Sequence, residues 1–226
     1  MVPAFLHVLI SSFLETSRRQ IVASVTVRFS GSSSLLNNIK ATEALLGVVK
    51  TNSALWKWVL LSSHASLQSL AVCKLTRTDG FGAMTDEIER QIQQFYQDKK
   101  DTFHNADDFA KLASKQHVAT FPVLMRRLGY RVPTKEGFQS ENNLSLRALY
   151  ILHEHRNTFL HYPPISFSVK EADLVFLIKT TFSIISHELS LDNWKRQPLI
   201  VSCDIDPLLN AIDQHFADLH SRSSEI

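Results

Sequence analysis

Residues 54–75 read ALWKWVLLSSHASLQSLAVCKL, and this stretch decides the fold that we predict. Its apolar side chains cover a wide arc of a helix; they are Leu55, Trp58, Val59, Leu60, Leu67, Leu70 and Ala71. A helix that is apolar on most sides is one that other elements surround. We therefore expect residues 54–75 to form a central core helix. Trp56 and Trp58 are two positions apart and cannot share a helix face, so one should lie in the core and the other at an interface.

Helical patterns also dominate the chain on either side of this stretch, with few strand signals between the breaks. We expect further helices from residue 35 to a break at 47–52, and over 85–99, 105–115, 118–128, 143–161, 168–189 and 207–220. Start signals precede three of them: a cap at Thr85, a capping box at Ser168–Glu171 with Phe167 as its hydrophobic staple, and the pair Asp206–Pro207. Short connections favour antiparallel neighbours, so we predict an all-α, antiparallel helical bundle.

The first 34 residues differ from the rest of the chain. A five-residue alternation from Val25 to Phe29 is too short to separate strand from helix, and the cluster Gly31–Ser34 is typical of a linker or turn. We therefore assign residues 1–34 to an N-terminal appendage whose structure the pattern leaves open, and residues 35–226 to one helical domain.

Composition and charge narrow the class of protein. The chain has 226 residues, of which 44% are hydrophobic and 20% charged, as in globular domains. Its formal net charge is only +2, so contact with RNA or DNA would need a local patch of basic residues. The apolar run at residues 2–10 is not preceded by Lys or Arg, as a signal peptide would require, and Lys179 interrupts the longest later run. We expect a cytoplasmic protein with no membrane contact.

The helix expected over residues 143–161 is amphipathic in an informative way. Its apolar residues fall on one stripe that should face the core: Leu144, Ala148, Ile151, Leu152 and Phe159. At about 100° per residue, polar side chains occupy the opposite face: Tyr150, Glu154, Asn157 and His161, with Arg156 on the flank. Pro163–Pro164 should end the helix just after His161. Chemically useful groups therefore gather at the end of one helix.

The segment Arg156–His161, RNTFLH, resembles the R-x4-6-H motif of the HEPN superfamily, in which a polar residue such as Asn157 usually follows the arginine. The motif lies near the end of an amphipathic helix and is followed by a second apolar helix, as in many HEPN domains. The resemblance extends over residues 35–190 and is closest over 143–189. It implies a HEPN-like helical bundle, and it implies metal-independent cleavage of RNA.

The resemblance also implies a role for each motif residue. His161 would accept the proton of a ribose 2′-OH or donate one to the leaving oxygen. Arg156 would hold the phosphate with two N–H donors and stabilise the charge that builds on it, with Asn157 assisting. Family members typically bring two motifs together in a dimer, so we expect a homodimer acting on RNA, as a toxin or antiviral defence effector with a possible antitoxin protein as partner.

Other residues are candidates for binding the substrate around this motif: Tyr150, Glu154, Tyr162, Arg126 and Arg127. We expect no cofactor. His153 and His155 invite a metal site, but two positions along a helix turn them about 200° apart, so they cannot chelate one ion together.

Two alternatives stay open. Arg156 can instead pair with a neighbouring carboxylate such as Glu154, while His161 caps the C-terminal end of its own helix. The whole protein can be a catalytically silent HEPN-like dimer that binds a nucleotide or another protein.

Overall fold

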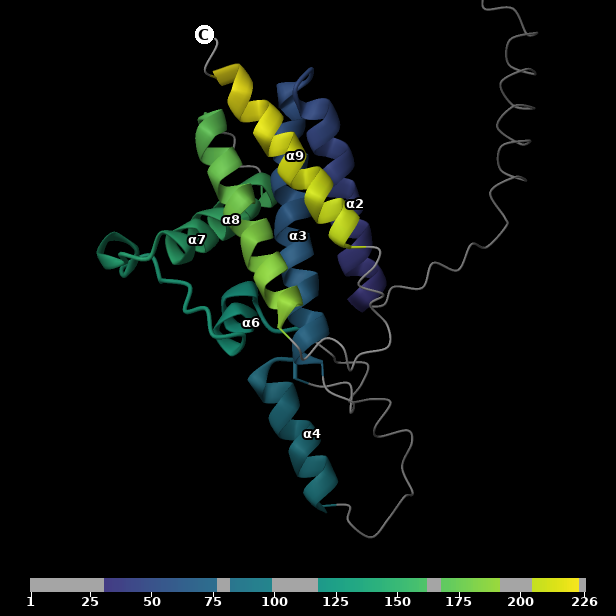
Figure 1. The fold of residues 1–226 in the computed structure, drawn as a ribbon. Helices are drawn as coiled ribbons and strands as arrows, with labels where there is room; N and C mark the ends of the chain where they lie inside the picture. Colours follow the sequence, from purple (N-terminus) through teal and green to yellow (C-terminus); the bar gives the residue numbers. More distant parts are fainter. Residues whose placement is uncertain (1–30, 77–81, 99–117, 162–167, 192–204, 224–226) are drawn as a thin grey trace, which may run out of the picture. The chain divides into compact units, whose positions relative to one another are not determined.

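The computed structural model describes residues 31–76, 82–98, 118–161, 168–191 and 205–223, and most of these residues lie in helices (Figure 1). The helices are α2 (Gly31–Val49), α3 (Trp56–Leu75), α4 (Asp86–Asp98), α6 (Phe121–Arg127), α7 (Leu144–His161), α8 (Glu171–Ser190) and α9 (Asp206–Ser223), with short 3-10 turns at Ser53–Leu55 and Phe138–Ser140. Within these ranges the structure has no β-strand, only an isolated bridge between Met84 and Val118. The prediction of an all-α protein is confirmed.

Helix α3 lies at the centre of the described core, where it contacts α2, α6, α7 and α8 (Figure 1). Residues along its whole length are buried; they are Trp56, Val59, Leu60, Ser63, His64, Ser66, Leu67, Leu70, Ala71 and Cys73. This confirms the expected core helix. Of the two tryptophans, Trp56 is the core residue and Trp58 is 54% exposed.

Helix α2 packs along α3, and the polar side chains at their contact form hydrogen bonds with groups of the same two helices. Thr42 Oγ1 donates to the Asn38 carbonyl at 2.9 Å and lies 2.9 Å from Ser62 Oγ. Asn38 Nδ2 donates to Ser69 Oγ at 3.0 Å. Because buried polar groups are costly only when they lack partners, these small side chains let the two helices pack without that cost.

Helix α9 packs on α2 and α8. Phe216 is buried, and two polar contacts lie near it in sequence: an ion pair of Lys50 with Asp218 at 2.9 Å, and a contact of His215 Nε2 with Glu43 Oε1 at 3.2 Å. The C-terminal helix thereby covers the side of α2 that α3 leaves open.

A buried ionic cluster joins the C-terminal ends of α3 and α8. Glu188 is 4% exposed, forms an ion pair with Lys74 and accepts a hydrogen bond of 2.8 Å from Tyr130 Oη. Burial, with the adjacent Glu188 carboxylate, raises the pKa of Tyr130 above its usual range. The cluster anchors the loop between α6 and α7 to the helical core.

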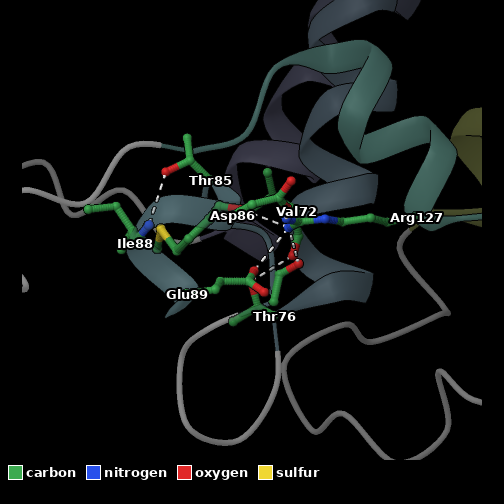
Figure 2. Close-up of polar contacts among 9 residues, drawn as sticks. Val72, Thr76, Thr85, Asp86, Ile88, Glu89 and Arg127 are labelled. Carbon is green, nitrogen blue, oxygen red and sulfur yellow. Dashed lines mark hydrogen bonds and ion pairs between the residues drawn. The ribbon is translucent and has the colours of Figure 1, made fainter. Parts of the chain in front are cut away.

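Arg127, at the end of α6, holds the start of helix α4 (Figure 2). Its Nη1 donates to the carbonyls of Gly82 and Met84 at 2.9 and 2.7 Å and to Glu89 Oε1 at 2.9 Å, while Nη2 pairs with Asp86. The guanidinium therefore satisfies two carbonyls and two carboxylates that arise about 40 residues earlier in the chain.

Several expected boundaries are confirmed. Helix α4 follows Thr85, whose Oγ1 accepts from the Ile88 N–H at 3.4 Å, and α9 begins at Asp206. The break expected at 47–52 lies three residues later, at 50–55, because α2 continues to Val49. Two expectations were wrong. Gly31–Ser34 is the first turn of α2 and not a linker, and the capping box at Ser168 does not form.

Helix α8 begins three residues after Ser168. Its N-cap is Lys170, which makes no side-chain cap bond, and the first turn closes on the Lys170 carbonyl through the N–H groups of Asp173 and Leu174. Three expected features lie outside the described residues: the helix over 105–115, the staple residue Phe167, and the helix stop at Pro163–Pro164. None of the helices in the described ranges has the length and apolar character of a membrane-spanning segment.

We expect Arg127→Ala to release helix α4 selectively. The change leaves two carbonyls and two carboxylates without their shared donor, which should cost about 1–2 kcal/mol because the group is only partly buried. Hydrogen exchange should accelerate at the amides of α4 while α3 stays protected. Arg126→Ala is the matched control, since its neighbouring side chain is exposed. Equal effects of the two substitutions on α4 would contradict this role.

Candidate functional site

Helix α7 carries the motif residues and is fixed at its start by Asn143. The Asn143 Oδ1 accepts from the N–H groups of Ser145 and Leu146 at 2.9 and 3.2 Å, which caps the helix. The expected helix is confirmed at Leu144–His161. It packs against α3 and α8, and its buried residues are Ala148, Leu149 and Leu152.

The expected apolar stripe is correct over most of α7 but wrong at its first residue. Ala148 and Leu152 are buried, and Ile151 and Phe159 are half-buried. Leu144 is 63% exposed, and the buried positions begin one turn later, so the first turn of the helix extends beyond the core.

A line of hydrogen-bonded side chains runs from the end of α7 into the core. Arg156 Nη1 donates to Asn157 Oδ1 at 3.0 Å, and Asn157 Nδ2 lies 3.2 Å from His153 Nε2. His153 Nδ1 in turn lies 3.3 Å from Nε2 of His64 on α3. His64 is only 2% exposed, whereas Arg156 and Asn157 are half-buried. We call these four residues the polar chain.

Aromatic stacking packs the two imidazoles of the polar chain against helix α6. The Phe121 ring lies 4.3 Å from His64 and 5.2 Å from His153 between centroids, and the planes of Phe121 and His153 differ by 15°. The planes of the two imidazoles differ by only 22° with centroids 5.5 Å apart, so the rings lie nearly coplanar and meet at the nitrogens of their edges. Three helices, α3, α6 and α7, therefore meet at these rings.

Burial makes both imidazoles poor bases. It lowers the pKa of His64 from 6.5 to about 3, with smaller contributions from His153 and Arg156. Burial also lowers the pKa of His153, where the nearby Glu154 carboxylate opposes the effect and Arg156 adds to it. Both rings are consequently neutral near pH 7, as acceptors in a hydrogen-bonded chain must be.

The structure brings some of the predicted site residues together and separates others. Arg156 and Asn157 are bonded to each other, and His161 is exposed at the last position of the same helix. Glu154 is exposed, and its carbonyl accepts from Thr158 Oγ1 at 2.9 Å. The Tyr150 ring packs against Phe138 with centroids 4.9 Å apart.

The two arginines considered for binding RNA differ from each other. Arg126 is exposed, whereas the guanidinium of Arg127 is committed to α4. Tyr162 lies outside the described residues.

Neither His64 nor its contact with His153 was predicted from the sequence. His64 stood in the sequence as a polar residue in the middle of an apolar helix, which was a usable signal that it needs a partner. His153 was weighed only against His155 as a metal ligand. In the described part of the chain, His, Cys, Asp and Glu do not gather in any group of three that could hold a metal ion.

Comparison of the chain with protein-family models, with curated proteins and with solved structures finds no match. The functional argument must therefore come from the residues of α7 and from what surrounds them.

We expect the stability of the fold to fall as the pH drops below about 6.5. The folded-state pKa of His64 is about 3 and the ordinary value is 6.5, so between these values the unfolded chain binds a proton that the folded chain does not. From pH 7.5 to pH 5 this single group should remove about 2 kcal/mol from the free energy of unfolding.

Urea unfolding at the two pH values measures this loss. His64→Gln keeps a side chain that can accept from His153 but cannot titrate, so its stability should depend less on pH. His187→Gln, at an exposed position of α8, is the control and should behave as the wild type. The same pH slope in His64→Gln and wild type would show that His64 is not the group that titrates.

Proposed function

We propose that this protein is a HEPN-like, metal-independent endoribonuclease that works as a symmetric homodimer in the cytoplasm. The observation that carries the proposal is the arrangement at the end of α7: Arg156 is held by Asn157 through a 3.0 Å bond, and His161 is exposed one turn further along. A fixed cation and an accessible imidazole on one helix end are the two groups that metal-free cleavage of RNA needs. The helical fold is compatible with an antiparallel HEPN-like bundle.

The reaction that these groups suit begins with the ribose 2′-OH. One His161 accepts its proton as the 2′-oxygen attacks the adjacent phosphorus, and a proton is donated to the 5′-oxygen as the P–O5′ bond breaks. The products are a 2′,3′-cyclic phosphate and a free 5′-hydroxyl. The requirement for a 2′-OH selects RNA over DNA.

Arg156 is suited to the charged phosphate. A guanidinium carries five N–H donors, more than its bond to Asn157 uses, and two parallel bonds to phosphate oxygens stabilise the charge of the transition state. The planar fork also fixes the orientation of the phosphate, which a lysine ammonium does not.

A homodimer supplies what one chain lacks. A base and an acid are needed on opposite sides of the phosphate, and two copies of His161 would provide both. We place the dimer contact on the side of α7 that bears Tyr150, Glu154 and Asn157. Leu160, 48% exposed beside His161, gives that end of the helix an apolar residue for the contact. Arg126 is the exposed basic residue that could extend the RNA contact, and an antitoxin protein could act by covering the cleft.

Substitution of the motif residues separates chemistry from structure. His161→Ala should lower the rate of cleavage of a mixed-sequence single-stranded RNA by about 10²-fold or more, with little change in melting temperature, because His161 lies outside the core. Arg156→Lys should also fail, since it keeps the charge but loses the fork. His187→Ala, an exposed histidine on α8, is the matched control and should cleave as the wild type.

The opposite result would favour the silent dimer that binds a nucleotide or another protein. Full cleavage by both motif variants, or no cleavage by a folded dimeric wild type on any RNA tested, including total cellular RNA, would exclude the proposed chemistry.

Cleavage should persist in EDTA. The mechanism draws its base, acid and phosphate ligand from His161 and Arg156, so removal of divalent ions should change the rate by less than about threefold, through the salt dependence of RNA binding alone. The same RNA assay with EDTA, and then with excess Mg²⁺ or Mn²⁺, measures this. Loss of activity on chelation with recovery on adding either metal would rule out the metal-free mechanism.

A further inference from the structure

The polar chain has a direction, and Arg156 sets it. A guanidinium in a protein stays protonated and only donates, so Asn157 must turn its Oδ1 toward Arg156. The amide then turns its Nδ2, which also only donates, toward His153. His153 Nε2 must therefore be the acceptor of that bond.

The same logic fixes the next link. With a bare Nε2, neutral His153 carries its proton on Nδ1 and donates it to Nε2 of His64, 3.3 Å away. His64 is then bare at Nε2 and protonated at Nδ1. The reverse direction fails at Asn157, because either orientation of its amide would place two donors face to face. One permanent cation thus selects both tautomers.

We propose that His153 is a positioning residue: it holds Asn157, and through Asn157 the guanidinium of Arg156, in the orientation that receives a phosphate, while His64 anchors the chain in the core. That the ligand of Arg156 is an RNA phosphate rests on the proposed function, but the positioning of Arg156 by His153 does not depend on it. Arg156 and Asn157 are half-buried on the last turns of α7, where a side chain without such support samples several rotamers.

The surroundings of His153 make it a rigid support. The Phe121 ring of α6 stacks on it at 5.2 Å and also contacts the buried His64 at 4.3 Å, and Nε2 of that His64 lies 3.3 Å from His153 Nδ1. Packing therefore fixes the ring plane and leaves Nε2 aimed at Asn157. This is how a supporting residue defines the geometry of a group that it does not itself bring to the substrate.

Protonation of His153 would undo this support. With a proton on Nε2, the ring faces the Nδ2 donor of Asn157, and rotation of the amide would turn Nδ2 toward Arg156 instead. The titratable groups that act on His153 are Glu154 and Arg156 of its own helix and His64 of α3. Helix α6 contributes the uncharged Phe121 ring, and Asp173 of α8 acts on His155. Protonation of His153 in acid should therefore loosen Arg156.

The first test needs no RNA. In ¹⁵N-detected NMR spectra of the imidazoles at pH 7, we expect His153 as the neutral Nδ1–H tautomer. Asn157→Asp replaces the Nδ2 donor with a carboxylate oxygen, so Nε2 should gain a proton and the apparent pKa of His153 should rise by about one unit or more. The Nε2–H tautomer in the wild type, or an unchanged titration in Asn157→Asp, would overturn the direction of the chain.

The second test reads Arg156 directly. His153→Leu keeps volume but offers no acceptor, so the guanidinium ¹⁵N signals of Arg156 should show faster rotation and solvent exchange, whereas His153→Gln, which can accept from Asn157, should restore them. If His153→Leu fails to fold, the comparison of wild type with His153→Gln across pH remains: only the wild type should lose order at Arg156 in acid. Identical Arg156 signals in all three proteins would overturn the proposal.

Binding then connects the positioning to function. A single-stranded RNA with 2′-O-methyl riboses cannot undergo attack, so it reports affinity alone. His153→Leu should weaken its binding by about tenfold or more in the wild-type background and by less than about twofold in Arg156→Ala. Equal weakening in both backgrounds would show that His153 does not act through Arg156. If the wild type binds no RNA, the proposed function fails, while the NMR results still decide the positioning.

Discussion

The burial of helix α3 is the constraint on which the rest of the described structure depends. Four helices pack against it, and its side chains are buried on almost every turn from Trp56 to Cys73. A buried polar side chain there needs a partner, either a carbonyl of α3 itself, as for Ser63 and Ser66, or a group on a neighbouring helix. His64 is such a side chain, and its partner comes from α7. The hydrogen-bonding requirement of one core residue is therefore met by a side chain near the end of α7 that carries the candidate site.

From this contact a single hydrogen-bonded line reaches the half-buried end of α7, and its members depend on one another. Replacing His64 and His153 by apolar residues of similar size would remove two buried polar groups, which is often neutral in a core. Here it would leave the Asn157 Nδ2 without its acceptor and Arg156 with a mobile partner. The unsatisfied hydrogen-bonding group would then be on Asn157, nearer the surface than His64. The buried imidazoles and the motif residues therefore depend on one another.

Much of the fold could be predicted from the sequence because helical periodicity and end signals are local. The extent of α3, the Thr85 cap of α4, the span of α7 and the start of α9 all follow from residues within one or two turns. The failures are also local in origin. Gly31–Ser34 has a loop-like composition but forms the first turn of a helix that packs on α3. Helix α8 begins at Glu171, so Ser168 is not its N-cap. Tertiary packing overrides such weak preferences.

The candidate site was harder to predict because its decisive contacts are distant in sequence. Periodicity places Arg156, Asn157 and His161 at one helix end, and the structure agrees. Periodicity cannot predict that His153 contacts His64, 89 positions earlier in the chain. The spacing of residues within a helix shows on which face of the helix a side chain lies, but not which residue it contacts. Arg127 shows the same limit: its residue type made it a candidate for binding RNA, yet the guanidinium binds Asp86 and Glu89 of α4.

The two arginines show that the same guanidinium group can have two different uses. Arg127 donates hydrogen bonds within the fold, to two carbonyls and two carboxylates, and so connects α4 to α6. Arg156 has a neutral amide as its partner at 3.0 Å, which orients the guanidinium without neutralising it. A carboxylate at position 157 would hold Arg156 more strongly but would compete with any phosphate. An asparagine backed by a neutral imidazole fixes the direction of the cation and leaves its charge available, which is the combination that a phosphate-binding arginine requires.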